Sequence, residues 1–199
     1  MAFRTFGSTI KMNNTLTTPQ PLIGSWITAG LSTPGNQPVT ITLGTATTSG
    51  NDATNLFIPG DPVWLIDPNG ANAEACRIQS VSANTVTLGP QNDAGNFVTR
   101  NPHVSGAFGT GTFIMLNIDA NNLYLQFEDG ATGQWLYIGN AFNFTATSHR
   151  VVKLSKVPAN SQPIEWRSTE NFYGSPFRVS ELWSLGTTGD TYCITAGIL

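Results

Sequence analysis

The chain carries two pairs of carboxylates whose spacing raises the question of acid–base chemistry. Glu128 and Asp129 are adjacent, and a second pair, Glu165 and Glu170, flanks Trp166. A glycosidase uses two carboxylates that face each other across the scissile sugar bond, and a tryptophan beside them would suit such a cleft. Glu128 and Asp129, however, lie in an expected hairpin turn, where neighbouring side chains diverge. We therefore expect solvated loop acids and a chain that is not an enzyme.

The histidines and cysteines are too widely separated in sequence to form a recognisable hydrolase or zinc-binding motif. No Gly-x-Ser-x-Gly nucleophile elbow lies near His103 or His149. A zinc site needs ligands at short paired spacings, which these histidines and the two cysteines, Cys76 and Cys193, do not provide. Both cysteines sit in apolar, strand-like stretches, which predicts buried thiols in a reducing cytoplasm. The sequence leaves open whether they pair, and we expect neither a metal nor a cofactor.

The composition excludes several classes of partner. Only 11% of the residues are charged, the net charge is −3, and there are 9 Lys and Arg residues. A nucleic-acid surface needs clustered cations, so none is expected. No apolar run approaches the ~18 residues that would span a membrane, and the N-terminus does not resemble a secretory signal. A hydrophobic content of 40% nevertheless predicts a folded chain.

The local patterns predict an all-β protein. Apolar residues alternate with threonine over residues 39–43 and with polar residues over residues 123–128. Turn sequences separate such runs, and Gly, Pro and Asn recur too densely for long helices. Within the turns we single out four structural residues, with Asp61 accepting backbone hydrogen bonds at a strand entrance. These residues are Gly60, Asp61, Asn69 and Gly70.

Three regions are expected along the chain. Residues 1–38 read as an extended N-terminal arm, residues 39–117 as a first β unit and residues 118–199 as an aromatic-rich, β-sandwich-like unit. The arm has few charges, several prolines and isolated apolar anchors that we expect to bind a neighbouring chain. These anchors are Leu22, Ile23 and Trp26. We accordingly expect deletion of residues 1–20 to leave a folded protein that attaches poorly to its partner.

Aromatic residues crowd the second unit and leave two interpretations open. They form either a sandwich core with an oligomer contact or a surface on which sugar rings stack. The residues that we expect at such a subunit or carbohydrate contact are Trp135, Tyr137, Trp166 and Tyr173.

One stretch, between Phe57 and Gly106, is similar to a known family. The shared positions are Phe57, Gly60, Asp61, Val63, Ile66, Glu74, Ile78, Ser80, Val81, residues 84–88, His103 and Gly106. This pattern resembles a small β-barrel module that recurs in the virion proteins of tailed bacteriophages, including decoration, tail and baseplate components. The resemblance implies a small β-barrel over residues 39–117.

The same resemblance implies a function and partners. It points to a non-enzymatic capsid decoration or cement protein that stabilises the phage head, located in virions assembled in the host cytoplasm. The implied partners are the major capsid protein and the chain itself, as a homotrimer at three-fold positions. The alternative is a tail-fibre, spike or baseplate component that binds host-surface carbohydrate.

Overall fold

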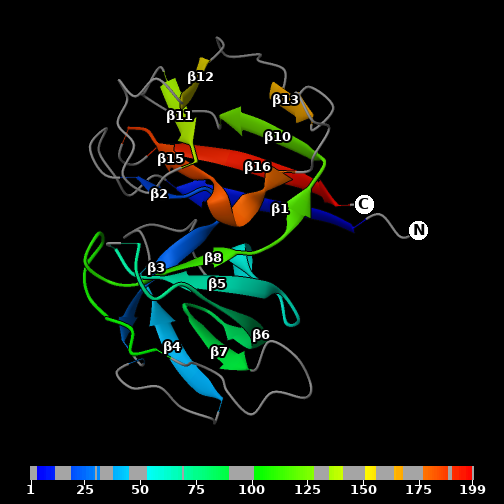
Figure 1. The fold of residues 1–199 in the computed structure, drawn as a ribbon. Helices are drawn as coiled ribbons and strands as arrows, with labels where there is room; N and C mark the ends of the chain where they lie inside the picture. Colours follow the sequence, from blue (N-terminus) through cyan, green and yellow to red (C-terminus); the bar gives the residue numbers. More distant parts are fainter. Residues whose placement is uncertain are drawn as a thin grey trace. The chain divides into compact units, whose positions relative to one another are not determined.

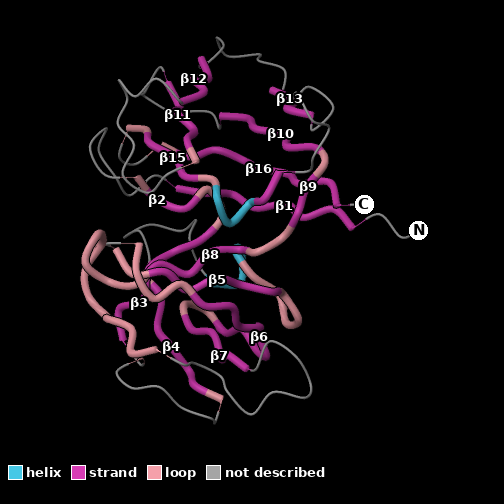
Figure 2. The backbone as a smooth tube through the Cα atoms, viewed as in Figure 1, coloured by secondary structure: helices cyan, strands magenta, loops and turns pink. Residues whose placement is uncertain are grey.

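We describe the fold from a computed structural model of the 199-residue chain. The structure describes residues 4–11, 19–29, 31, 38–44, 53–68, 70–89, 101–127, 135–140, 151–155, 164–167, 177–187 and 190–198. Within these ranges β-strand is the predominant secondary structure, which confirms the predicted all-β class (Figures 1 and 2). The helical segments described are one turn of α-helix, α1 (Ala53–Leu56), and a short 3₁₀ segment, η2 (Val179–Glu181).

The chain folds into two compact units, and one of them is discontinuous in sequence. Residues 23–117 form one unit, whereas residues 1–22 and 118–199 together form the other. The boundaries therefore differ from the three consecutive regions expected from the sequence. The reason is long-range pairing: strands from the two ends of the chain belong to one sheet, which periodicity alone does not reveal.

The unit of residues 23–117 is a closed six-stranded antiparallel barrel (Figure 1). Its strands, in spatial order, are β3 (Gly24–Ala29), β4 (Val39–Leu43), β7 (Thr85–Gly89), β6 (Glu74–Ser82), β5 (Pro62–Ile66) and β8 (Phe113–Leu116). Closure pairs every strand on both sides, so the barrel has no exposed edge. Its core contains Ile27, Ile41, Val63, Leu65, Ile78, Val86, Leu88, Ile114 and Leu116, all at most 1% exposed.

The other unit contains two four-stranded sheets. The first has the order β1 (Arg4–Lys11), β16 (Thr191–Ile198), β10 (Asn122–Phe127) and β13 (Ile164–Arg167). The second has the order β12 (Val151–Ser155), β11 (Trp135–Gly139), β15 (Trp183–Leu185) and β2 (Gln20–Pro21). A short ladder joins β14 (Phe177–Arg178) to β9 (Asp119–Ala120).

Buried side chains connect these two sheets in a sandwich-like arrangement. The inward positions of β10 and β16 are Leu123, Leu125, Tyr192, Ile194 and Ala196, none more than 2% exposed. From the first sheet, the Tyr192 hydroxyl lies 3.2 Å from the Ser184 hydroxyl of the second and donates to the Leu22 carbonyl at 3.4 Å. Burial raises the pKa of Tyr192, so this phenol stays protonated and available as a donor.

The N-terminal segment is not the free arm that the sequence suggests. Residues 4–11 form β1, which pairs antiparallel with β16 from Arg4 opposite Ile198 to Lys11 opposite Thr191. Residues 20 and 21 form β2 against β15. The described strands of this segment are thus edge strands that pair on one side with strands of their own chain, which is not the arrangement of a free arm.

The three expected anchor residues are core residues. Leu22 and Ile23 are completely buried, and Trp26 is 9% exposed. The Trp26 ring contacts the Phe108 ring edge-on, with the ring centroids 5.1 Å apart, and a Cβ at Gly44 would overlap its indole. These side chains are therefore buried by their own chain and present no free surface to a partner, which corrects the expected role.

Candidate functional site

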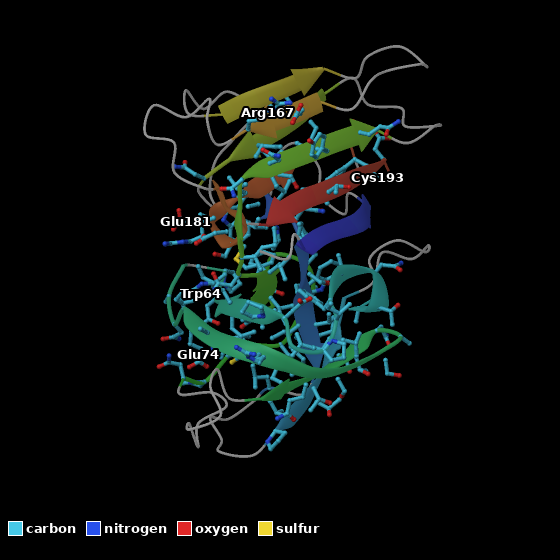
Figure 3. The ribbon with its side chains drawn as sticks, turned by 90° about the vertical axis from the view of Figure 1, so that its right-hand side faces the viewer. Trp64, Glu74, Arg167, Glu181 and Cys193 are labelled. Atoms are coloured by element: carbon cyan, nitrogen blue, oxygen red, sulfur yellow. The ribbon has the colours of Figure 1, made fainter. Side chains whose placement is uncertain are left out.

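A buried polar cluster lies in the barrel unit and brings together residues far apart in sequence. Asp67 follows β5 directly, Glu74 opens β6, and His103 and Thr112 belong to the segment that precedes β8. All four are buried, with His103 only 3% exposed. Figure 3 labels Glu74 on its barrel strand.

The His103 imidazole is held between two carboxylates. Its Nδ1 lies 3.0 Å from Asp67 Oδ1, and its Nε2 lies 2.8 Å from Glu74 Oε1. The Thr112 hydroxyl donates to Asp67 Oδ1 at 2.7 Å and accepts from the Val104 amide at 3.0 Å. The cluster therefore fastens the 103–112 segment to the turn between β5 and β6.

Hydrogen bonds keep Asp67 ionised in spite of its burial. Burial raises the pKa of Asp67, but hydrogen bonds with His103, Thr112 and the Asn72 amide outweigh this effect and hold the pKa below its usual range. An ionised Asp67 requires a proton on His103 Nδ1, because that nitrogen must donate to it.

The second imidazole nitrogen implies a shared proton. If Nε2 is protonated it donates to an ionised Glu74; if it is not, Glu74 must carry the proton and donate to Nε2. In both cases the three side chains together carry one negative charge.

The cluster is built for support rather than for nucleophilic catalysis. A general base needs a free ring nitrogen near a nucleophile, and here a carboxylate occupies the position at each nitrogen. The nearby thiol of Cys76 is completely buried, and burial together with the Glu74 charge raises its pKa to about 12. A thiol held neutral in this way is inert.

A second cluster lies on the exposed side of the sheet that contains β10 and β13. The Tyr124 hydroxyl donates to Glu165 Oε1 at 2.8 Å, and the Arg167 guanidinium binds both carboxylate oxygens at 2.6 and 2.8 Å. The hydrogen bond with Glu165 raises the pKa of Tyr124, and the bonds from Arg167 and Tyr124 lower the pKa of Glu165. Figure 3 labels Arg167 on this sheet.

The turn residues expected from the sequence have structural roles where the structure describes them. Gly60 and Gly70 adopt positive φ angles of 95° and 77°, which glycine tolerates best. Asp61 is 1% exposed, and its carboxylate accepts a hydrogen bond from the Ile58 amide at 2.8 Å, the kind of contact predicted for it. Asn69 lies outside the described residues.

The expected aromatic contact residues are not found together at a described surface. Tyr137 on β11 is only 9% exposed, so its ring belongs to the interior, and the expected contact role is wrong for it. The side chains of Trp135 and Trp166, and all of Tyr173, lie outside the described residues. The exposed aromatic residue of this unit that the structure describes is instead Tyr124, at 36% exposure.

Of the two carboxylate pairs considered for acid–base chemistry, the structure describes Glu165 alone. Glu165 pairs with Arg167, whereas Glu128, Asp129 and Glu170 lie outside the described residues, as does His149. Cys76 and Cys193 are not disulfide-bonded, and Cys76 is the buried thiol that the sequence predicts. Within the described residues no group of three or more His, Cys, Asp or Glu side chains could hold a metal ion.

Sequence reasoning missed both clusters, although each left a trace. Glu74 and His103 are both positions of the barrel-module pattern, but nothing in the pattern says that they touch. Tyr124 lies on the polar side of the alternating run that buries Leu123 and Leu125. That alternation was enough to place Tyr124 on the surface, while its partners on β13 depended on strand register.

Comparison of the chain with protein-family models, with curated proteins and with solved structures finds no match. Among the described residues no helix is long and apolar enough to cross a membrane.

Proposed function

We propose that this chain is a non-enzymatic structural protein of a tailed-bacteriophage particle, and that it decorates and cements the capsid. It would act as a homotrimer that bridges copies of the major capsid protein. Its place is in the virion, assembled in the host cytoplasm. The resemblance of residues 57–106 to the phage barrel module is the origin of this proposal.

One observation carries the proposal: residues of the pattern shared with the phage barrel module have structural roles in the closed barrel. Phe57 and Ile78 are at most 1% exposed, Asp61 closes a turn, and Glu74 binds His103. Each is used to hold the barrel together, as a mechanical role requires. The two buried carboxylates at the imidazole also support a non-enzymatic chain, because they occupy the positions that a substrate and nucleophile would need.

A second candidate is a tail-fibre, spike or baseplate component that binds host carbohydrate. The exposed Tyr124 with its hydrogen-bonded neighbours favours this candidate, because glycan sites combine an aromatic ring with planar polar groups.

The number of copies per particle distinguishes the candidates. Quantitative mass spectrometry of purified particles should give hundreds of copies for a decoration protein and a few dozen or fewer for a tail component. Sedimentation of the isolated chain should give a trimer at micromolar concentration. Absence from the particles would refute both candidates, and a stable monomer would refute the trimer.

A further inference from the structure

The outward side of β10 forms the centre of an open polar surface. Asn122, Tyr124 and Gln126 alternate with the buried Leu123 and Leu125, so the first three share the outward side. Alternate residues of a strand lie about 7 Å apart, which places one amide side chain on either side of the Tyr124 ring along the strand.

The neighbouring strands extend this surface with small residues on one side and a charge-neutral pair on the other. On β16, Thr195 pairs with Tyr124 and Gly197 pairs with Asn122, and on β1 Gly7 pairs with Thr195. A directly opposite residue on a neighbouring strand lies only about 5 Å away, so a small residue there leaves room beside the tyrosine ring. A Cβ at Gly197 would lie 3.7 Å from the Asn122 Cβ, an ordinary van der Waals contact, so Gly197 and the Asn122 side chain lie on the same side of the sheet.

On the other side, β13 fixes the orientation of the tyrosine. Glu165 pairs with Tyr124 and Arg167 with Asn122, and the carboxylate of Glu165 binds both the Tyr124 hydroxyl and the Arg167 guanidinium. A ring tethered at its hydroxyl loses little freedom when a ligand stacks on it, and such preorganisation favours binding. The carboxylate and guanidinium also cancel each other's charge.

We propose that this surface, defined as Asn122, Tyr124, Gln126, Glu165, Arg167 and Thr195, binds a neutral glycan. The exposed ring supplies a stacking platform, and the amide, hydroxyl and carboxylate groups around it match the alternating donors and acceptors of sugar hydroxyls. A charged ligand would find no uncompensated charge among these residues. A protein interface of standard size would need a larger apolar centre than one tyrosine ring.

This inference deepens the second candidate function and rests on it for its biological setting. The site differs from the aromatic set expected from the sequence, because Tyr137 is buried and Tyr124 takes its place. The number of copies per particle tests the proposed function, whereas glycan binding tests this inference. The two are measured separately, so a failure of one proposal is distinguishable from a failure of the other.

The test is a binding measurement on the full-length chain. Isothermal titration or NMR chemical-shift titration would use a panel of neutral oligosaccharides (gluco-, galacto- and manno-configured) and, beside it, uronic-acid and sialylated oligosaccharides. We expect at least one neutral oligosaccharide to bind at millimolar concentration or tighter. Tyr124→Ala should weaken this binding by roughly tenfold or more, and Gln126→Ala less strongly.

Two further variants separate the ring from its surroundings. Tyr124→Phe keeps the ring but loses the bond to Glu165, so it should bind more weakly than wild type and more tightly than Tyr124→Ala. Ile58→Ala is the matched control, because Ile58 is an exposed large side chain on the barrel unit, and it should bind like wild type. Unchanged thermal melting of each variant would show that the fold is intact.

Three results would overturn the proposal. The first is no binding of any neutral oligosaccharide at millimolar concentration, and the second is binding of the acidic oligosaccharides alone. The third is self-association of the chain that Tyr124→Ala abolishes without any glycan binding, which would assign the surface to a second copy of this chain.

Discussion

His103 fastens a long connection to the barrel by bonding two carboxylates at once. Replacing it by glutamine removes either the hydrogen bond to Asp67 or the one to Glu74. Removing one partner of a buried hydrogen bond to a charged group is strongly destabilising, so His103→Gln should lose about 2–3 kcal/mol of unfolding free energy in urea denaturation. Val104→Ala, an exposed neighbour, should change stability by less than about 0.5 kcal/mol. A stability of His103→Gln equal to that of the control would contradict the fastening role.

Asp67 makes the stability of the protein depend on pH in the acid range. Its pKa in the folded state is below the ordinary value, near 3.8, that it has when unfolded. The stabilisation is therefore complete above the unfolded-state pKa and is lost as the pH falls through the folded-state pKa. Asp67→Asn should be less stable than wild type at pH 6, and the difference should shrink below about pH 4. Urea denaturation of both proteins between pH 2 and pH 6 measures this, and a constant difference over the range would contradict it.

At the scale of single elements, β1 is a structural strand of the unit that it completes. It pairs with β16 along its whole length, so its removal leaves the backbone groups on that side of β16 without partners. We expect deletion of residues 1–11 to lower the thermal midpoint of this unit clearly, or to prevent its folding. Circular dichroism melting checks this. A melt indistinguishable from wild type would restore the expectation of a dispensable arm.

The Cys76 thiol on β6 should be protected from alkylation as long as the barrel stays closed. The Cys76 side chain is fully buried with a pKa raised to about 12, whereas Cys193 on β16 is half-buried. Thiolate is the reactive form, so iodoacetamide should label Cys193 first and Cys76 only when the barrel opens. Peptide mass spectrometry over time, with and without urea, measures the extent of alkylation at both cysteines. Early labelling of Cys76 in the native protein would show an open barrel.

The elements were easier to predict from the sequence than their partners. Alternation identified the strands at residues 39–43 and 123–127, and the turn at Gly60 and Asp61 followed from local chemistry alone. The pairing of β1 with β16 was not predictable, because it joins residues 180 or more positions apart and no local rule selects such a partner. The His103 cluster was missed for the same reason: its members come from separate segments that only the closed barrel brings together.

For the whole molecule, the barrel is an insertion in the other unit. The chain enters the barrel at Ile23 and leaves it at Asn117. Entry and exit are neighbours, since β3 pairs with β8 and the Leu116 amide donates to the Ile23 carbonyl at 3.0 Å. Insertions are tolerated when the ends of the inserted domain lie close together, because the host then needs little distortion to accommodate them. Each unit accordingly has its own buried core.

This topology predicts that the two units fold independently. Residues 23–117 expressed alone should fold cooperatively, because the closed barrel has no unpaired edge and contains the whole His103 cluster. The complementary protein, with Leu22 joined to Ile118 by a short glycine–serine linker, should keep the pairing of β1 with β16, since a short loop costs little closure entropy. Dispersed amide NMR spectra that superimpose on subsets of the full-length spectrum are the expected result for both fragments. If the barrel folds but the joined fragment does not, the unit of residues 1–22 and 118–199 depends on the inserted barrel for its folding. If residues 23–117 alone give a collapsed spectrum, the barrel is not an autonomous unit despite its closure.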